Sequence, residues 1–268
     1  MRALALAPVW GWLLLGVAAP ALVLVVIALS APTDAVPPFI LGFHLDALRS
    51  VADPLYLDAL RGSVWLAAVT AAVCLVLGYP MALAIARANL RWRGVLRGLV
   101  VLPFLTGVLL RLTAWVGILR DEGYLNGALL ALGMIDAPLP LLHSDAACVV
   151  GLVYVYLPFM VLPLEARLSA LDPALARAAA DLGAGPWAVW WRVTWPLSLP
   201  GVAADLVLVA VPVAGEVVVP ALLGAPETLT LGRAIWDVFF QERDWPQAAA
   251  LAVVLLGMVL VPLRWARP

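Results

Sequence analysis

Apolar residues occupy most of the chain in long runs that short polar stretches separate. Six of these runs approach or exceed the roughly 20 residues that an α-helix needs to cross a bilayer. They cover residues 8–30, 62–86, 98–119, 146–164, 197–223 and 246–263. The pattern predicts an all-α integral membrane protein with six transmembrane helices.

The composition agrees with this pattern. Hydrophobic residues make up 65% of the chain and charged residues 12%, with a mean hydropathy of +1.05. Soluble domains are nearer half apolar and a quarter charged. The net charge of −1 gives no indication of a nucleic-acid partner.

Residue types that carry chemistry are scarce. All 16 basic residues are arginine, so the chain lacks the lysine of a Walker A loop, and any ATP hydrolysis belongs to another chain. His44 and His143 are isolated in loops, and no catalytic constellation is evident. We therefore expect no catalytic, cofactor-binding or metal-ligating residue here. Cys74 and Cys148 lie inside predicted spans, which favours core thiols over a disulfide.

The arginines predict the orientation. If both termini face the cytoplasm, ten arginines lie on that side and five on the other, with Arg111 inside a span. The positive-inside rule favours this arrangement. It places residues 31–60 on the outer side of the membrane and the loop at 169–197 in the cytoplasm.

The loop at 169–197 reads as two short helices. Asp172 can cap a helix, Pro173 suits its first position, and an alanine-rich run extends to residue 182. Gly183 then fits the left-handed position beyond a helix end. A second short helix is expected over 187–195, ending at two prolines. Such a rigid helical knob suggests a docking surface.

Two acidic residues lie inside the fifth run. Asp205 and Glu216 are eleven residues apart, so one continuous helix would carry both on one face, roughly 16 Å apart. A carboxylate at membrane depth usually faces a bundle interior or a water-filled path. With Arg111 they are the candidate translocation path. The alternatives are that Asp205 reaches cytoplasmic water and that Glu216 pairs structurally with Arg111.

The loop sequence AAADLGA, followed by a tryptophan-rich helix and LPG, resembles the signature loop of ABC importer permeases. In that family the first helix is the coupling helix, which sits in a groove of the ATPase subunit. Ala178, Ala179 and Gly183 fall on the motif, whereas Arg177 stands where the family has glutamate. The resemblance implies coupling residues at Asp172, Arg177, Ala178, Ala179, Asp181, Leu182, Gly183 and Ala184.

Residues 63–87, 102–133, 155–164 and 212–252 resemble the polyamine branch of these permeases. Glu216 lies in a Gly-Glu-x-Val-x-Pro run that is similar to the putrescine permease type. The resemblance implies a substrate such as putrescine or spermidine. Permeases for sulfate, iron or phosphonates remain an alternative. An ion-coupled secondary transporter also stays open, although the sequence indicates neither inverted repeats nor helices broken near the midplane.

The resemblance implies the type I ABC importer permease fold in a bacterial inner membrane, working by alternating access. Residues 1–60 then form the first transmembrane helix and a periplasmic segment, and 61–268 the permease core with five helices. The implied partners are a second permease subunit, two ATP-binding ABC subunits and a periplasmic solute-binding protein. ATP is expected on the partner subunits, and no cofactor on this chain.

Overall fold

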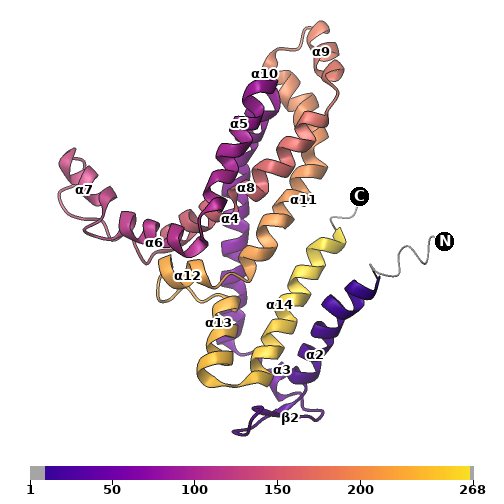
Figure 1. Cartoon of the computed structure of the whole chain (residues 1–268), viewed down its shortest axis with the longest axis vertical. Coiled ribbons are helices and arrows are strands. Elements are labelled where there is room, and N and C mark those ends of the chain that lie inside the picture. Colours follow the sequence, from indigo (N-terminus) through magenta and orange to yellow (C-terminus); the bar gives the residue numbers. More distant parts are fainter. Residues whose placement is uncertain (1–9, 266–268) are drawn as a thin grey trace. The chain divides into compact units, whose positions relative to one another are not determined.

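The computed structural model describes residues 10–265, and nearly all of their regular structure is helical (Figure 1). The described residues form two compact units, one from residues up to Ser63 with Leu229–Pro262 and one from Val64–Thr228. The mostly helical prediction is confirmed. The predicted first run begins at residue 8, and residues 8 and 9 lie outside the described part.

The unit that holds the start of the chain combines helices with one small hairpin. Its elements are the apolar helix Trp10–Ala28, which includes η1 (Leu14–Ala18) and α2 (Ala19–Ala28), then β1 (Ala31–Pro32), β2 (Phe39–Ile40), α3 (Asp46–Ser50), the start of α4 (Pro54–Arg87), α13 (Leu231–Asp237), η4 (Val238–Glu242) and most of α14 (Trp245–Trp265). The two strands are antiparallel, with Ala31 opposite Ile40. The buried Ser63 hydroxyl accepts a 2.8 Å hydrogen bond from the Leu231 N–H, which ties α4 to α13.

The second predicted span starts earlier than expected. The sequence places its start at residue 62, but α4 already begins at Pro54. Proline fits the first turn of a helix, where its missing N–H costs nothing. The leucines and alanines that follow favour helix, so α4 extends through residues too polar for the apolar run to include.

The unit of residues 64–228 is a bundle of helices. It contains the rest of α4, α5 (Leu90–Val101), η2 (Leu102–Leu105), α6 (Val108–Leu119), α7 (Tyr124–Ala131), α8 (Asp145–Ala170), α9 (Pro173–Asp181), α10 (Pro186–Val189), η3 (Trp190–Thr194), α11 (Trp195–Ala214) and α12 (Val218–Leu223). Helices α8 and α11 pack side by side (Figure 1). Tyr79 and Ile85 of α4 join Val161, Leu164 and Val202 in the core. Cys74 and Cys148 are buried free thiols, as the sequence predicts.

The described residues hold four helices that are long and apolar enough to cross a membrane. These are Trp10–Ala28, Pro54–Arg87, Asp145–Ala170 and Pro186–Ala214. A bent pair, Leu90–Leu105 with Val108–Ala131, makes a fifth if it counts as one span, and Trp245–Leu260 is a shorter apolar helix.

The prediction of one continuous third helix over 98–119 is wrong. The chain breaks between η2 and α6, and the helices on the two sides meet at 88°. Pro103 lacks the N–H that a helix needs, and Gly107 stands directly before α6. The run is apolar throughout, so hydropathy alone does not reveal the break.

The prediction of one continuous fifth helix over 197–223 is also wrong. Helix α11 ends at Ala214, Gly215 caps it, and α12 starts at Val218. Asp205 therefore lies within α11, whereas Glu216 lies in the break. The two acids do not share the face of one helix.

Candidate functional site

Helix α9 is exposed at one end of its unit and is capped as the sequence predicts (Figure 1). Asp172 Oδ1 accepts a 2.8 Å hydrogen bond from the Ala174 N–H, and Pro173 is the first helical residue. Asp172 thus satisfies a donor that the helix leaves free.

The other end of α9 closes in a Schellman motif. Gly183 has a φ of +88°, and its N–H donates to the Ala180 carbonyl at 2.9 Å. The Ala184 N–H donates to the Ala179 carbonyl at 3.1 Å, which completes the motif. Leu182 is 90% exposed beside this rigid turn. Of the remaining residues assigned to the loop, three are exposed, namely Arg177, Ala178 and Asp181.

The predicted second short helix over 187–195 is wrong in its extent. The helix runs without interruption over Pro186–Ala214 and includes Pro196 and Pro200. The widened turn η3 precedes Pro196, and the Trp195 N–H bonds back to the Trp190 carbonyl. A widened turn already departs from the regular bonding pattern, so it tolerates a following proline that lacks an N–H.

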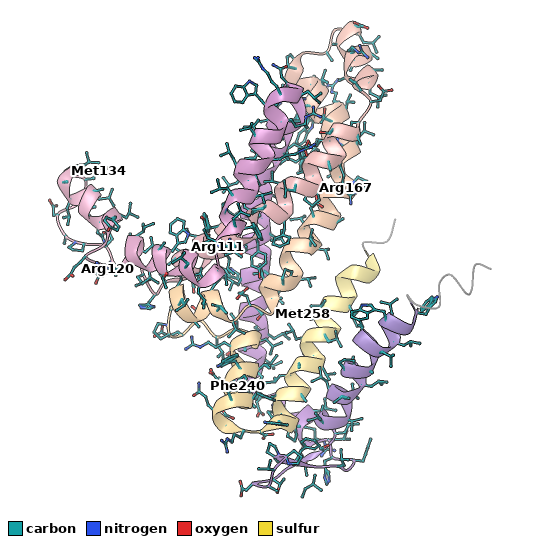
Figure 2. The ribbon with its side chains drawn as sticks, viewed as in Figure 1. Arg111, Arg120, Met134, Arg167, Phe240 and Met258 are labelled. Atoms are coloured by element: carbon teal, nitrogen blue, oxygen red, sulfur yellow. The ribbon has the colours of Figure 1, made fainter. Side chains whose placement is uncertain are left out.

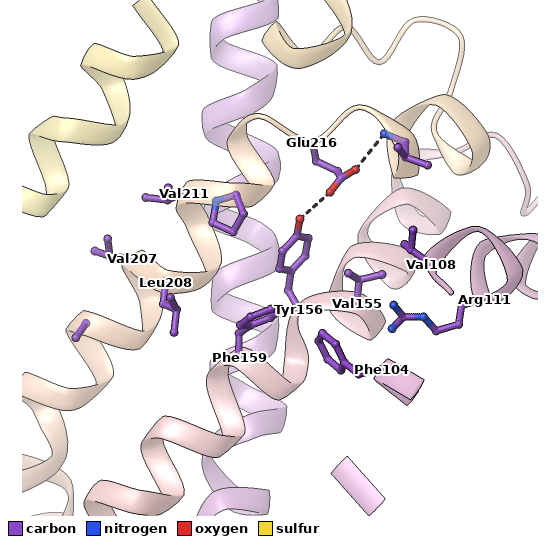
Figure 3. A pocket seen from close by; sticks show the side chains of 13 residues that line it. Phe104, Val108, Arg111, Val155, Tyr156, Phe159, Val207, Leu208, Val211 and Glu216 are labelled. Atoms are coloured by element: carbon purple, nitrogen blue, oxygen red, sulfur yellow. Dashed lines mark hydrogen bonds between the residues drawn. The ribbon is translucent and has the colours of Figure 1, made fainter. Parts of the chain in front are cut away.

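A cavity of about 620 Å³ lies within the unit of residues 64–228. Its walls come from η2, α6, α8, α11 and α12, and they are mostly apolar. Three rings line it, and the Phe159 ring centroid lies 5.3 Å from that of Phe104 and 5.9 Å from that of Tyr156. Figure 3 shows the polar groups of this cavity, which are the Tyr156 hydroxyl, the Glu216 carboxylate and the Arg111 guanidinium.

Glu216 is held in place by two hydrogen bonds. Its Oε2 accepts from the Tyr156 hydroxyl at 2.6 Å, and its Oε1 accepts from the Val218 N–H at 3.0 Å (Figure 3). The break between α11 and α12 provides the free backbone N–H. Each carboxylate oxygen keeps a further lone pair, so the oriented group can still accept from a ligand cation.

Arg111 lines the same cavity from α6, at the base of the arm that α6 and α7 form (Figure 2). It is 9% exposed, and its Nε and Nη1 have no hydrogen-bond partner among the described residues. Its Cζ lies 5.3 Å from the Phe104 ring centroid, a cation–π contact. Arg111 forms no ion pair with Glu216 in the described part of the chain.

Asp205 is not among the residues that line this cavity. It is 2% exposed on α11, and its Oδ2 has no hydrogen-bond partner within residues 10–265. The Arg167 side chain of the neighbouring α8 packs against α11 at Gly201, one helical turn before Asp205. Of the three residues predicted for the path, the structure thus gathers Glu216 and Arg111 around one cavity and leaves Asp205 elsewhere.

Sequence reasoning missed the aromatic residues of the cavity. Tyr156 and Phe159 are three residues apart on α8, a spacing that places both on one helix face. That spacing, within the segment 155–164 already noted for its resemblance, was the available signal. The contact of Tyr156 with Glu216 joins residues 60 positions apart, which local patterns do not reveal.

Apolar helices of spanning length, a cavity among them and an exposed, capped helix at one end are features that a helical membrane transport protein requires. The chain belongs to the family of binding-protein-dependent transport system inner membrane components, which matches residues 74–263. It is therefore a multi-pass inner membrane protein and a transport permease.

Relatives of known function and one solved structure agree with this family. The spermidine/putrescine transport system permease protein PotB of Escherichia coli (strain K12) is 38% identical over 255 residues, covering 94% of this chain and 92% of PotB. The molybdenum transport system permease protein ModB of Mycobacterium bovis is 34% identical, covering 78% and 77%. A chain of the bacterial alginate ABC transporter, solved with an alginate pentasaccharide-bound periplasmic protein, has a TM-score of 0.75 at 20% identity, covering 99% and 92%.

The family excludes the secondary-transporter alternative, although the described residues do contain interrupted helices, which the sequence did not indicate. The breaks lie between η2 and α6 and between α11 and α12. The second break supplies the Val218 N–H that orients Glu216 in the cavity.

Proposed function

We propose that this chain is one membrane-spanning subunit of an ATP-driven importer for polyamines such as putrescine and spermidine. The oriented Glu216 carboxylate in an aromatic-walled cavity carries the proposal. A polyamine presents ammonium groups on a methylene chain, so a carboxylate and ring faces would offset the cost of its dehydration. The substrate named for the Escherichia coli relative supports the same class.

In this proposal the chain has six spans and both termini in the cytoplasm. The bent pair of helices is the third span and Trp245–Leu260 belongs to the sixth. The distribution of arginines supports the orientation. Arg2 and Arg267, which contribute to that distribution, lie outside the described residues. Residues 1–60 hold the first span and a periplasmic segment, and 61–268 the core.

The resemblance to ABC importer permeases supports the proposed partners, and the loop at 169–197 supports the contact with the ATPase. Helix α9 docks on an ATPase subunit, and a second permease, two ATP-binding subunits and a periplasmic solute-binding protein complete the importer. ATP binds the partner subunits, and this chain holds no cofactor. Alternating access then requires that ATP binding favour one state through a differential interaction at α9.

A different small solute is the second candidate function. Sulfate and phosphonate are anions. Two Arg111 nitrogens in the same cavity have no partner among residues 10–265, and they would favour an oxyanion. An iron importer is a further candidate, because an acidic group suits a metal cation. The relative named for molybdenum transport supports diversity of solutes within the family.

Glu216→Gln in the assembled importer separates these candidates. This substitution removes the charge and keeps the size of the side chain. In wild type the carboxylate would offset part of the desolvation cost of the ammonium groups, which is several kcal/mol per ion. We therefore expect uptake of radiolabelled putrescine to fall at least about tenfold while the complex still hydrolyses ATP. Uptake into proteoliposomes with the cognate binding protein measures this effect.

The control is Glu122→Gln, because Glu122 is an exposed carboxylate outside the cavity. It should leave uptake unchanged. Normal putrescine uptake by a well-assembled Glu216→Gln importer would contradict the polyamine proposal. The polyamine proposal would also be contradicted if the importer took up sulfate, if Arg111→Gln abolished that uptake and if Glu216→Gln preserved it.

A further inference from the structure

A separate cavity of about 270 Å³ lies behind α9, where α4 ends, α5 begins and α8 leads into α9. Arg87 and Arg93 line it together with the hydroxyl-bearing Ser169 and Thr194. Leucines of α4, α8, α9 and α11 supply apolar surface. The start of α5 and helices α9 and α10 lie at this same end of the unit (Figure 1).

The two arginines leave donors free in this cavity. Arg93 Nη2 donates to the Ala86 carbonyl at 2.6 Å and so closes the end of α4. Its Nε is buried and has no hydrogen-bond partner in the described part of the chain. Arg87 is exposed and forms no ion pair among the described residues. A buried donor without a partner requires an explanation, and a bound acceptor provides one.

Carboxylates nearby are already engaged. Asp172 uses Oδ1 to cap α9. Glu165 is 2% exposed and binds Arg97 through two hydrogen bonds of 2.8 and 2.9 Å, with a third from Ser169 at 2.7 Å. Two guanidinium groups against the single carboxylate of Asp172 leave the cavity lining with a net positive charge, which suits an anionic ligand.

Exposed tryptophans surround this end of the bundle. Trp187 is 73% exposed, and Trp92 and Trp191 are also exposed. The Trp187 and Trp190 ring centroids lie 4.6 Å apart, so the tryptophans form a packed group. Tryptophan concentrates where membranes meet water, so these side chains favour a position for this end of the bundle near the bilayer surface. Basic pockets between helices on the cytoplasmic side bind acidic lipid headgroups.

We propose that this cavity binds the phosphate group of an anionic phospholipid. Arg87 and the Nε of Arg93 bind the phosphate oxygens, and an acyl chain follows the leucines towards the bilayer. Since Leu175 and Ala176 of α9 also line the cavity, a bound lipid holds α9 against the α4–α5 connection. The inference uses the cytoplasmic placement of α9 from the proposed function and is independent of the transported solute.

Lipid retention tests this site directly. The complete importer is purified in mild detergent, and mass spectrometry measures phosphatidylglycerol and cardiolipin per complex. Arg87→Gln should lower the retained anionic lipid several-fold. Arg91→Gln is the matched control, because Arg91 is exposed on the same connection and does not line the cavity. Arg93→Lys is the second variant. The substitution is conservative because Arg93 also donates a hydrogen bond to a carbonyl at the end of α4.

A functional arm identifies the source of the phosphate. ATPase activity of the importer should rise when phosphatidylglycerol is added to phosphatidylcholine nanodiscs, for wild type and Arg91→Gln but not for Arg87→Gln. Inorganic phosphate alone should have no such effect. Equal lipid retention in all variants would overturn the proposal, and so would full stimulation by inorganic phosphate. Neither readout involves a polyamine, so failure here leaves the proposed solute untouched.

Discussion

Three buried or half-buried acidic side chains in the bundle differ in what surrounds them. Glu165 is fully paired by Arg97 and Ser169. Glu216 is oriented by the Tyr156 hydroxyl and still faces a cavity. Asp205 has an oxygen with no partner in the described part of the chain. At the scale of single residues, only Glu216 combines orientation with room for a ligand.

The environment of Asp205 leads to a prediction about stability. A buried acceptor without a partner costs about 1–3 kcal/mol, and more when it is charged. Asp205→Asn removes the charge and keeps the shape, so we expect the importer to unfold at a higher temperature. Thermal unfolding in detergent, followed by intrinsic tryptophan fluorescence, measures this change.

Putrescine uptake by the same variant is the accompanying measurement, and it should stay within about twofold of wild type. A lower unfolding temperature would instead assign Asp205 a stabilising ion pair with Arg167. A severe loss of uptake in a stable Asp205→Asn importer would mean that Asp205 belongs to the translocation path.

Residue-level features could be predicted from the sequence where they depend on near neighbours. The caps at Asp172 and Gly183 follow from local backbone chemistry, and the structure contains both. The contact between Tyr156 and Glu216 depends on how α8 packs beside the end of α11. That packing follows from the tertiary fold, so the position of Glu216 could be predicted only as far as its depth in an apolar run.

At the scale of elements, the end of α9 can be tested by a matched pair of glycines. Gly183 has a φ of +88°, whereas Gly185 has a φ of −68°. An added Cβ would have open space at both positions, so only the backbone conformation distinguishes them. A β-branched residue at positive φ costs about 1–3 kcal/mol.

We therefore expect Gly183→Val to distort the end of α9 and to lower transport relative to ATP hydrolysis. Gly185→Val should leave both near wild type. The ratio of solute transported to ATP hydrolysed, in reconstituted importer with saturating binding protein, is the quantity to measure. An unchanged ratio for Gly183→Val would show that the shape of this turn does not matter for coupling.

The breaks in the third and fifth predicted spans mark where element prediction fails. Hydropathy is continuous through Pro103 and Gly107 and again through Gly215, because their neighbours are apolar. Proline can remain inside a membrane helix, as Pro200 does in α11, so its presence alone does not locate a break. The surrounding helices determine which proline or glycine interrupts the chain.

At the scale of the whole molecule, the sequence predicted the class of protein and the family. The signature around Gly183 and the segments on both sides of it contain enough residues for that. The number of spans is harder to predict, because the third predicted span is bent by 88°. Length and hydropathy describe an isolated helix, whereas a bend depends on the helices that pack around it.

Both thiols, Cys74 and Cys148, are buried, so the natural chain should give little background reaction in single-site thiol labelling. A maleimide reagent should react slowly with wild type, so the labelling measured in a variant with one introduced cysteine would come from that cysteine. Leu182→Cys places that reporter at a 90% exposed position beside the turn of α9. If α9 seats in an ATPase groove, the labelling rate should fall at least about tenfold in the assembled importer relative to the isolated chain, since docking removes access to the reagent. Equal rates in both would mean that this end of α9 stays open to water when the ATPase is bound.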